Sequence, residues 1–502
     1  MRQNQVKWGA ILSYILIIFN TLYGLFITPY ILGCIGEGDY GVYKTISSLT
    51  SALMVLDLGI GGTVMRYVAK FKAAKEDEKI PNFIAMNLVQ AAILCGVIGI
   101  AAAGIYTTID NAYAATFTTD QIAKAQDLFI GLIVNMMFHV MENVINGVIT
   151  GHNRFMFGNG VKVVRLLLRI LLVIILLQFF ADSLVIVLID LGVTIVFLLV
   201  EVWYIRKKLG VKIKLTKWEK TLFMESGKYT ALMFLTSIAA QVNNNLDNVI
   251  IGALSGPAFV TVYSFGLLIF GMFEQLSTSI SGVMLPTVTN LLAKEDGMGE
   301  VENLVVRTGR IQFMLLGAAL TGFFCIGKDF IRIWLGEGFD DVYIITLILM
   351  APALFELCVN VCLSILRAKN MLSFRTVTLF ASTILNAVVT VLAVRYWSYI
   401  GAALGTAASF IVGSLIVMNI YYYKKLGLNM LRIYRRILSG TWICLLIAGT
   451  GLYLFNYVFH GSLWSFAAGV MVFGSLFVTG MWLFGFNQEE RRMLKIGGNK
   501  ND

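Results

Sequence analysis

Apolar runs long enough to cross a bilayer follow one another along almost the whole chain. Hydrophobic residues make up 58% of the 502 residues and charged residues only 14%, whereas a soluble globular chain carries about 25% charged residues. A membrane-spanning helix needs about 20 mainly apolar residues. Fourteen segments meet this need: 8–33, 40–63, 82–106, 126–150, 160–181, 183–205, 228–254, 257–285, 307–327, 341–366, 372–396, 398–423, 437–459 and 463–485. We therefore predict an all-α membrane protein with about 14 transmembrane helices.

The distribution of positive charge supports this number and orients the chain. Cytoplasmic loops accumulate lysine and arginine. With the N-terminus inside and each basic residue assigned to its nearer side, 34 of the 39 basic residues fall inside and five outside. We therefore expect both termini in the cytoplasm of a cell whose inner membrane holds the chain. The net charge of +10 lies between apolar runs, so it does not indicate nucleic-acid binding.

Short matches show that the chain repeats itself. Residues 204–210 match 421–427 at an offset of 217, Asn143 and Asn153 match Asn360 and Asn370 at the same offset, and 31–43 match 251–263 at 220. The unit spans six helices, so both copies share one orientation. We predict an N-terminal lobe (1–210), a basic cytoplasmic linker (211–227), a parallel C-terminal lobe (228–427), and two extra helices with a cytoplasmic tail (428–502). Two such lobes favour an alternating-access transporter with its substrate at the repeat interface.

Ionisable residues inside a membrane span are costly unless they face water or a partner. Asp57 and Glu274 occupy the second helix of each repeat, 14 and 11 residues after Tyr43 and Tyr263. This correspondence favours a shared location in a substrate lumen. A buried hydrogen-bonded carboxylate that holds helices together is the alternative.

The seventh span carries the densest polar cluster. Its members are Gln241, Asn243, Asn244, Asn245, Asp247 and Asn248. At 100° per residue, Gln241, Asn244, Asn245 and Asn248 share one face, and an amide can both donate to and accept from sugar hydroxyls. We expect this face and Asp247 to line the lumen, with a polar helix–helix seam as the alternative.

Two further sets of charged residues are candidates. His139 and Glu142 lie at i, i+3 on the fourth span, and Glu356 matches His139 at the repeat offset. They are predicted to couple transport to an ion, or else to be satisfied core residues. Arg66, Arg154, Lys228, Arg307 and Arg375 lie near the cytoplasmic ends of their spans. They could meet a diphosphate, although topology alone also explains them.

No enzyme or metal site is indicated. The six cysteines lie in or beside apolar runs without CxxC pairs, which is typical of small buried hydrophobes. The sequence contains no nucleotide-binding motif or catalytic triad, and we expect no cofactor and no metal.

The chain resembles bacterial polysaccharide/oligosaccharide flippases, of the multidrug/oligosaccharidyl-lipid/polysaccharide exporter superfamily. The resemblance lies in Leu246-Asp247-Asn248-Val249-Ile250-Ile251-Gly252 with Gly256 and Val262-Tyr263, in Tyr40-Gly41-Val42-Tyr43 with Asp57-Leu58-Gly59-Ile60-Gly61, and in Glu489-Glu490-Arg491-Arg492. It implies a two-lobe fold that flips undecaprenyl-diphosphate-linked oligosaccharide to the outer leaflet for cell-surface polysaccharide synthesis. It also implies that Asp57, the asparagine face, Asp247 and Glu274 line the lumen.

Three other functions stay open at this point. A cation-coupled multidrug antiporter of the same superfamily would suit the acidic candidates, and a lipid II flippase would carry a related substrate. A membrane glycan polymerase would need outer acidic residues, for which only Glu337, Asp340 and Asp341 are available. The expected partners are a polyprenyl-diphosphate-linked glycan and membrane lipids. A glycan polymerase and other envelope assembly proteins are further possible partners, and nucleic acid is not expected.

Overall fold

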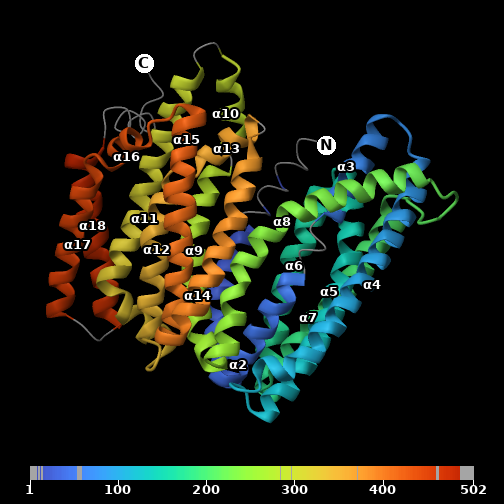
Figure 1. The fold of residues 1–502 in the computed structure, drawn as a ribbon, viewed down its shortest axis with the longest axis horizontal. Coiled ribbons are helices and arrows are strands. Elements are labelled where there is room, and N and C mark those ends of the chain that lie inside the picture. Colours follow the sequence, from blue (N-terminus) through green and yellow to red (C-terminus); the bar gives the residue numbers. More distant parts are fainter. Residues whose placement is uncertain are drawn as a thin grey trace. The chain divides into compact units, whose positions relative to one another are not determined.

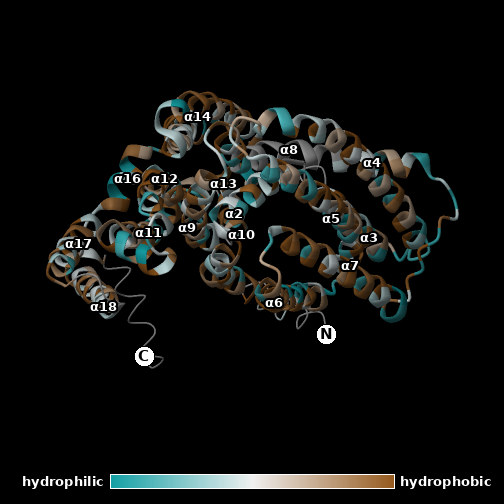
Figure 2. Ribbon diagram, turned by 90° about the horizontal axis from the view of Figure 1, so that it is seen from below, coloured by the Kyte–Doolittle hydropathy of each residue, from teal (hydrophilic) through white to brown (hydrophobic). Residues whose placement is uncertain are grey.

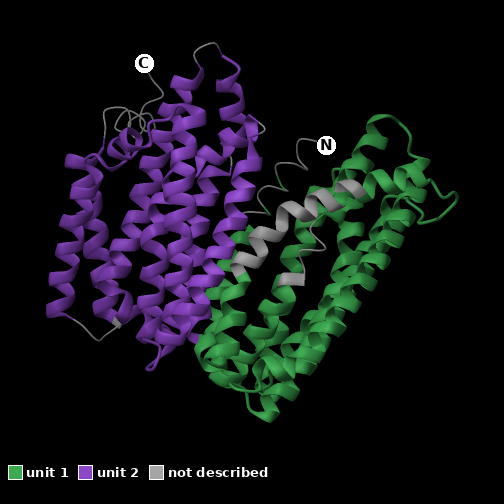
Figure 3. Ribbon diagram, in the orientation of Figure 1, with its two compact units in different colours: residues 1–261 green, residues 262–502 purple. Residues whose placement is uncertain are grey.

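Every regular element in the described part of the chain is a helix. The structure is a computed structural model that describes residues 15–53, 59–282, 284–294, 297–369, 371–459 and 463–486, together with 8 and 12. It does not describe the side chains of residues 228, 229 and 231–244. The chain forms two compact units, Met1–Thr261 and Val262–Asp502 (Figures 1 and 3).

The helices of the first unit are η1 (Tyr23–Ile27), α2 (Thr28–Leu53), α3 (Ile60–Ala73), α4 (Lys79–Tyr113), α5 (Thr119–Gly151), α6 (Phe155–Phe179), α7 (Ser183–Lys208) and α8 (Lys220–Leu254). Helix α9 (Pro257–Ser281) begins in the first unit and continues into the second. The second unit goes on with α10 (Leu285–Leu292), α11 (Gly297–Leu335), α12 (Asp341–Cys358), α13 (Val361–Ala368), α14 (Leu372–Ser409), η3 (Phe410–Val417), α15 (Met418–Leu426), α16 (Met430–Leu438), α17 (Thr441–Val458), α18 (Leu463–Gly480) and η4 (Met481–Gly485).

The predicted number of transmembrane helices is confirmed. Among the described residues, ten helices are long and apolar enough to cross a membrane. Two of these, at Ile15–Ser51 and Leu372–Leu426, contain a non-helical break, at Gly36 and at Trp397–Ser398. Each break falls between two predicted spans. Helices α6 and α8 coincide with the predicted spans at 160–181 and 228–254, so the fold contains about 14 transmembrane helices, in two lobes with two further helices at the C-terminal end.

The break in α14 turns the helix back on itself. A Cβ atom added to Gly401 would lie 2.4 Å from the carbonyl carbon of Ala393, and one added to Gly405 would lie 2.2 Å from Oγ1 of Thr390. Thr390 Oγ1 donates to Asn386 Oδ1 at 3.0 Å, and Thr406 Oγ1 approaches the same oxygen at 3.4 Å. The two halves therefore pack antiparallel, and glycine is required because their backbones nearly touch.

The surface of both units fits a bilayer. Large apolar side chains stand exposed along the spans, including Ile100 at 78%, Leu188 at 62% and Val478 at 64% relative exposure. Hydrophobic residues cover much of the helices in Figure 2. Such surfaces are unfavourable in water but match hydrocarbon, so the chain is a multi-pass membrane protein.

The sequence repeat has a structural counterpart in each unit. Phe157 stacks on Tyr204 with ring centroids 3.6 Å apart, and Phe374 stacks on Tyr421 with centroids 4.2 Å apart. Both rings of the second pair lie 217 residues after those of the first. The glycines that follow, Gly210 and Gly427, have φ angles of 67° and 69°, a left-handed conformation that glycine adopts readily.

The basic segment between α7 and α8 is held against α4. Asn82 Oδ1 accepts hydrogen bonds from the backbone amides of Thr216 and Lys217 at 2.9 and 3.1 Å. Its amide nitrogen donates to the Lys217 carbonyl at 2.8 Å. The residue boundaries that the sequence predicts for lobes and linker stay a prediction.

Candidate functional site

Helix α6 carries two arginines into the interior of the first unit. Arg165 and Arg169 are four residues apart, so they lie on one helix face, one turn from each other. Their side chains are only 20% and 23% exposed. Charged groups in a membrane span need partners, and α5 and α7 provide them.

Arg165 is bound on two sides. Its Nη1 donates to Glu142 Oε1 on α5 at 2.6 Å, and its Nη2 donates to Thr194 Oγ1 on α7 at 2.6 Å. The same Nη2 lies 3.3 Å from His139 Nε2, while His139 Nδ1 lies 3.0 Å from Glu142 Oε2. The predicted pair His139 and Glu142 is therefore one half of a four-residue cluster, and Arg165 joins three helices.

Arg169 forms a second, bidentate pair with Asp190 of α7. Its Nε donates to Asp190 Oδ1, and its Nη2 donates to Oδ2 at 3.0 Å. The guanidinium also lies 4.8 Å from the ring centroid of Tyr23, within the range of a cation–π contact. The N-terminal span is thus linked to α6 and α7.

A further carboxylate lies deeper along α7. Glu201 is 1% exposed, and its Oε1 accepts a hydrogen bond from Asn146 Nδ2 at 3.2 Å. Its Oε2 has no hydrogen-bond partner among the described residues. A buried carboxylate with a free oxygen is costly as an anion, so Glu201 is a candidate for holding a proton.

The second unit contains a shorter version of this arrangement. Arg375 of α14 lies 3.4 Å from Glu356 of α12 and 3.4 Å from Ser414 Oγ of η3. In both units the acid comes from the fourth span, the arginine from the fifth and the hydroxyl from the sixth. The first-unit cluster differs by the presence of a histidine.

Two residues of the predicted asparagine face lie inside the first unit. Asn248 is 6% exposed and donates to Ser48 Oγ on α2 at 2.9 Å, and Asp247 is 3% exposed. Asn245 is partly buried. This part of α8 thus forms a polar seam with α2, the alternative that the sequence left open for Asn248. The side chains of Gln241 and Asn244 and the whole of Asp57 lie outside the described residues.

The remaining candidates lie near the ends of helices or on their exposed faces. Glu274 is exposed on α9. Arg66 on α3, Arg154 just before α6 and Arg307 on α11 are also exposed. The Lys228 side chain lies outside those described. The structure does not join these cations to the α5–α6–α7 cluster.

Sequence reasoning missed Arg165, Arg169, Glu201 and the fully buried Arg310. Assignment of each basic residue to its nearer side counted the three arginines as cytoplasmic loop charges. The signal was their i, i+4 spacing in an apolar run for the first two. Arg310, 2% exposed, donates to the carbonyls of Arg436, Ser439 and Gly485, and no sequence pattern marks those carbonyls.

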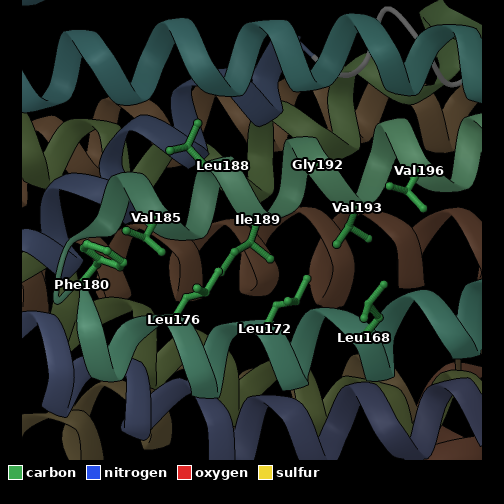
Figure 4. A pocket seen from close by; sticks show the side chains of 10 residues that line it. All are labelled: Leu168, Leu172, Leu176, Phe180, Val185, Leu188, Ile189, Gly192, Val193 and Val196. Atoms are coloured by element: carbon green, nitrogen blue, oxygen red, sulfur yellow. The ribbon is translucent and has the colours of Figure 1, made fainter.

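An apolar groove runs along the opposite side of α6 and α7 (Figure 4). It has a volume of about 540 Å³ and is lined only by hydrophobic residues and Gly192. Among the described residues, no group of three or more His, Cys, Asp and Glu side chains could hold a metal ion.

The fold and its buried charges define a polytopic membrane transport protein. A family model described as polysaccharide biosynthesis protein matches residues 6–292, more than half of the chain. The chain therefore belongs to the polysaccharide biosynthesis protein family, within the multidrug/oligosaccharidyl-lipid/polysaccharide exporter superfamily. It is a flippase or exporter of that superfamily.

Named relatives are distant. The uncharacterized membrane protein EpsK of Bacillus subtilis is 20% identical over 349 residues, which cover 67% of this chain and 65% of EpsK, just under two thirds of its length. The probable flippase AglR of Haloferax volcanii is 21% identical over 434 residues, 83% of this chain and 82% of AglR.

Solved structures share the fold. The lipid II flippase MurJ in an inward closed conformation has a TM-score of 0.75 and 13% identity, covering 97% of this chain and 99% of MurJ. A multidrug resistance transporter of the MATE family in an inward-facing conformation has a TM-score of 0.60 and 14% identity, covering 84% of this chain and 96% of its own.

Proposed function

We propose that this protein moves an oligosaccharide linked to a polyprenyl diphosphate, such as undecaprenyl diphosphate, from the inner to the outer leaflet by alternating access. The match of residues 6–292 to the polysaccharide biosynthesis family carries the proposal. A sugar polymer assembled outside the cell needs its lipid-linked units there, and their polar head cannot cross hydrocarbon unaided. A flippase meets this need without changing the substrate chemically.

The relatives support a flippase over other transport modes. AglR is named a probable flippase and MurJ a lipid II flippase. The second name makes lipid II the leading alternative substrate, because the MurJ fold covers 97% of this chain. Both substrate classes join a polyprenyl chain to sugars through a diphosphate.

The residues of the first unit suit parts of such a substrate. We propose that Asn245, Asp247 and Asn248, with the undescribed Asp57, Gln241 and Asn244, meet sugar hydroxyls, since amides and carboxylates hydrogen-bond to them. Opening of the Asn248–Ser48 contact would be part of this role. Glu274 joins this set as an exposed carboxylate on a span.

The diphosphate needs cations, and exposed arginines are available. Arg66, Arg154 and Arg307, with Lys228, are proposed to attract it, because guanidinium groups bind phosphate oxygens strongly. Arg165 and Arg169 are less suited, since carboxylates already neutralise them.

The α5–α6–α7 cluster suits ion coupling. Protonation of His139 would place a second positive charge beside Arg165 and compete for Glu142. We propose that this exchange, with Glu201 as a nearby proton carrier and Glu356 in the second unit, links transport to a proton or another cation.

The cellular setting follows from this function. We propose that the protein resides in the cytoplasmic membrane with both termini inside, as the charge asymmetry of the loops favours. Its partners would be the lipid-linked glycan and membrane lipids. A glycan polymerase and other envelope assembly proteins would act on the product.

A cation-coupled drug antiporter is the second candidate. The MATE fold and the buried Asp247 favour it, because an acidic site binds cations. The family match disfavours it, since that family is described by polysaccharide biosynthesis.

Ligand-induced stabilisation of the purified protein separates these candidates. A ligand at 100 times its Kd stabilises the state that binds it by about 2.7 kcal/mol. We expect thermal stabilisation by a polyprenyl-diphosphate oligosaccharide, less by lipid II, and little by its monophosphate analogue or a cationic drug. Arg307→Gln should weaken the effect, whereas Arg395→Gln, far along α14, should not. Stabilisation by the drug alone would overturn the proposal.

A further inference from the structure

We propose that the apolar groove between α6 and α7 binds one acyl chain of a bilayer phospholipid. The groove lies on the membrane-exposed side of two transmembrane helices of the first unit (Figure 4). This inference is independent of the transported substrate, so it stands or falls separately from the proposed function.

The groove exists because the two helices are joined on one side only. On their inner side, Arg165 reaches Thr194 and Arg169 reaches Asp190. On the outer side, Leu172 and Leu176 of α6 face Ile189 of α7 across a gap (Figure 4). The long arginine side chains therefore act as spacers, and the apolar rims do not close on each other.

Gly192 widens the gap at its centre. A Cβ atom added there would meet no atom within 4 Å. Neighbouring Val193 and Leu188 keep the walls apolar. An apolar cavity of this size stays dry and takes up apolar ligands, and in a membrane the available filling is hydrocarbon.

The dimensions select a single acyl chain. The lining extends along α6 from Leu168 to Phe180, about 18 Å at 1.5 Å per residue, close to the ~15 Å of one leaflet's hydrocarbon. The groove thus reaches from the α6–α7 connection to about the bilayer centre. A lipid of that leaflet can place one chain there while its headgroup stays at the surface.

Other occupants fit poorly. A helix about 10 Å across and 18 Å long would fill roughly 1,400 Å³, more than twice the 540 Å³ of the groove. A polyprenyl chain is much longer than one leaflet, so most of it would lie outside. The slender chain of a phospholipid matches both limits.

The test is photocrosslinking in liposomes with a phospholipid that carries a diazirine in the middle of one acyl chain. Labelled peptides are mapped by mass spectrometry. We expect labels concentrated on residues 168–196, and at least a fivefold loss of these labels in Gly192→Phe. Gly104→Phe on α4 is the matched control, because Gly104 is exposed and a Cβ there also meets no atom within 4 Å.

A graded variant keeps the test informative. Gly192→Ala adds one methyl group in open space and should reduce the labels by less than Gly192→Phe, even if the larger variant folds poorly. Uniform labelling of all spans, or labelling insensitive to both Gly192 variants, would overturn the proposal. Preferential labelling by a diazirine polyprenyl phosphate, or a crosslink to a second protein chain, would overturn the choice of occupant.

Discussion

Replacement of Glu142 by glutamine tests whether the buried cluster of the first unit depends on charge pairing. The change keeps the size of the side chain but removes the carboxylate that Arg165 contacts at 2.6 Å. Arg165 then keeps the Thr194 hydroxyl and the His139 ring, neither of which carries a compensating negative charge. The folded protein would hold a largely buried guanidinium without its counter-ion.

The expected loss of stability follows from burial. Removal of one partner of a buried ion pair costs about 3–5 kcal/mol. Glu142 is 9% exposed and Arg165 20% exposed at the side chain, and Arg165 keeps one short hydrogen bond. We therefore expect the lower end, about 3 kcal/mol, or roughly a hundredfold change in the unfolding equilibrium. Neutralising Arg165 as well, in Glu142→Gln/Arg165→Met, should recover part of this, with a coupling energy of about 2 kcal/mol.

The assay is equilibrium unfolding in mixed micelles, in which SDS is titrated against dodecyl maltoside and tryptophan fluorescence is followed. Glu300→Gln is the matched control. Its partner Lys294 lies at 2.8 Å, but both side chains are at least half exposed, so a loss below about 1 kcal/mol is expected. Equal effects of Glu142→Gln and Glu300→Gln, or strictly additive effects in the double variant, would refute the reasoning.

Three further predictions concern packing, capping and pH. Gly401→Ala should lower stability by about 2 kcal/mol, because the added methyl would meet the Ala393 backbone at 2.4 Å; Gly104→Ala, measured in the same thermal assay, should not. Arg310→Met should cost about 3 kcal/mol by leaving three buried carbonyl groups without their donor, and an unchanged melting temperature would contradict this. Burial lowers the pKa of His152, so the unfolded chain takes up the proton first and stability falls as the pH drops through about 6.5; His152→Gln should reduce the difference in melting temperature between pH 7.5 and 5.5.

The spans were predictable because the bilayer imposes a length on each of them. About 20 apolar residues are needed to cross hydrocarbon, and the sequence places a glycine or a polar residue between such runs. The breaks at Gly36 and Ser398 lie where one apolar run passes into the next. The repeat was also visible, since residues 204–210 and 421–427 end equivalent helices with the same turn.

The partners within the buried cluster were less accessible to sequence reasoning. His139 and Glu142 share a helix face by spacing alone. Their contact with Arg165 depends on how α5, α6 and α7 rotate against one another, which no local pattern encodes. Asn248 shows the same limit: its place in a polar stripe was readable, but its contact with Ser48, 200 residues earlier, came only from tertiary packing.

Transbilayer movement of the substrate tests the central claim most directly. The purified protein would be reconstituted in liposomes with a fluorescent polyprenyl-diphosphate oligosaccharide, and the fraction reached by an external quencher would be followed over time. We expect the protected fraction to become accessible only when the protein is present, and more slowly with Asp247→Ala, while the exposed Glu300→Gln variant behaves like the parent. A protected fraction that stays constant in the presence of folded protein would contradict the assignment as a flippase of lipid-linked oligosaccharides.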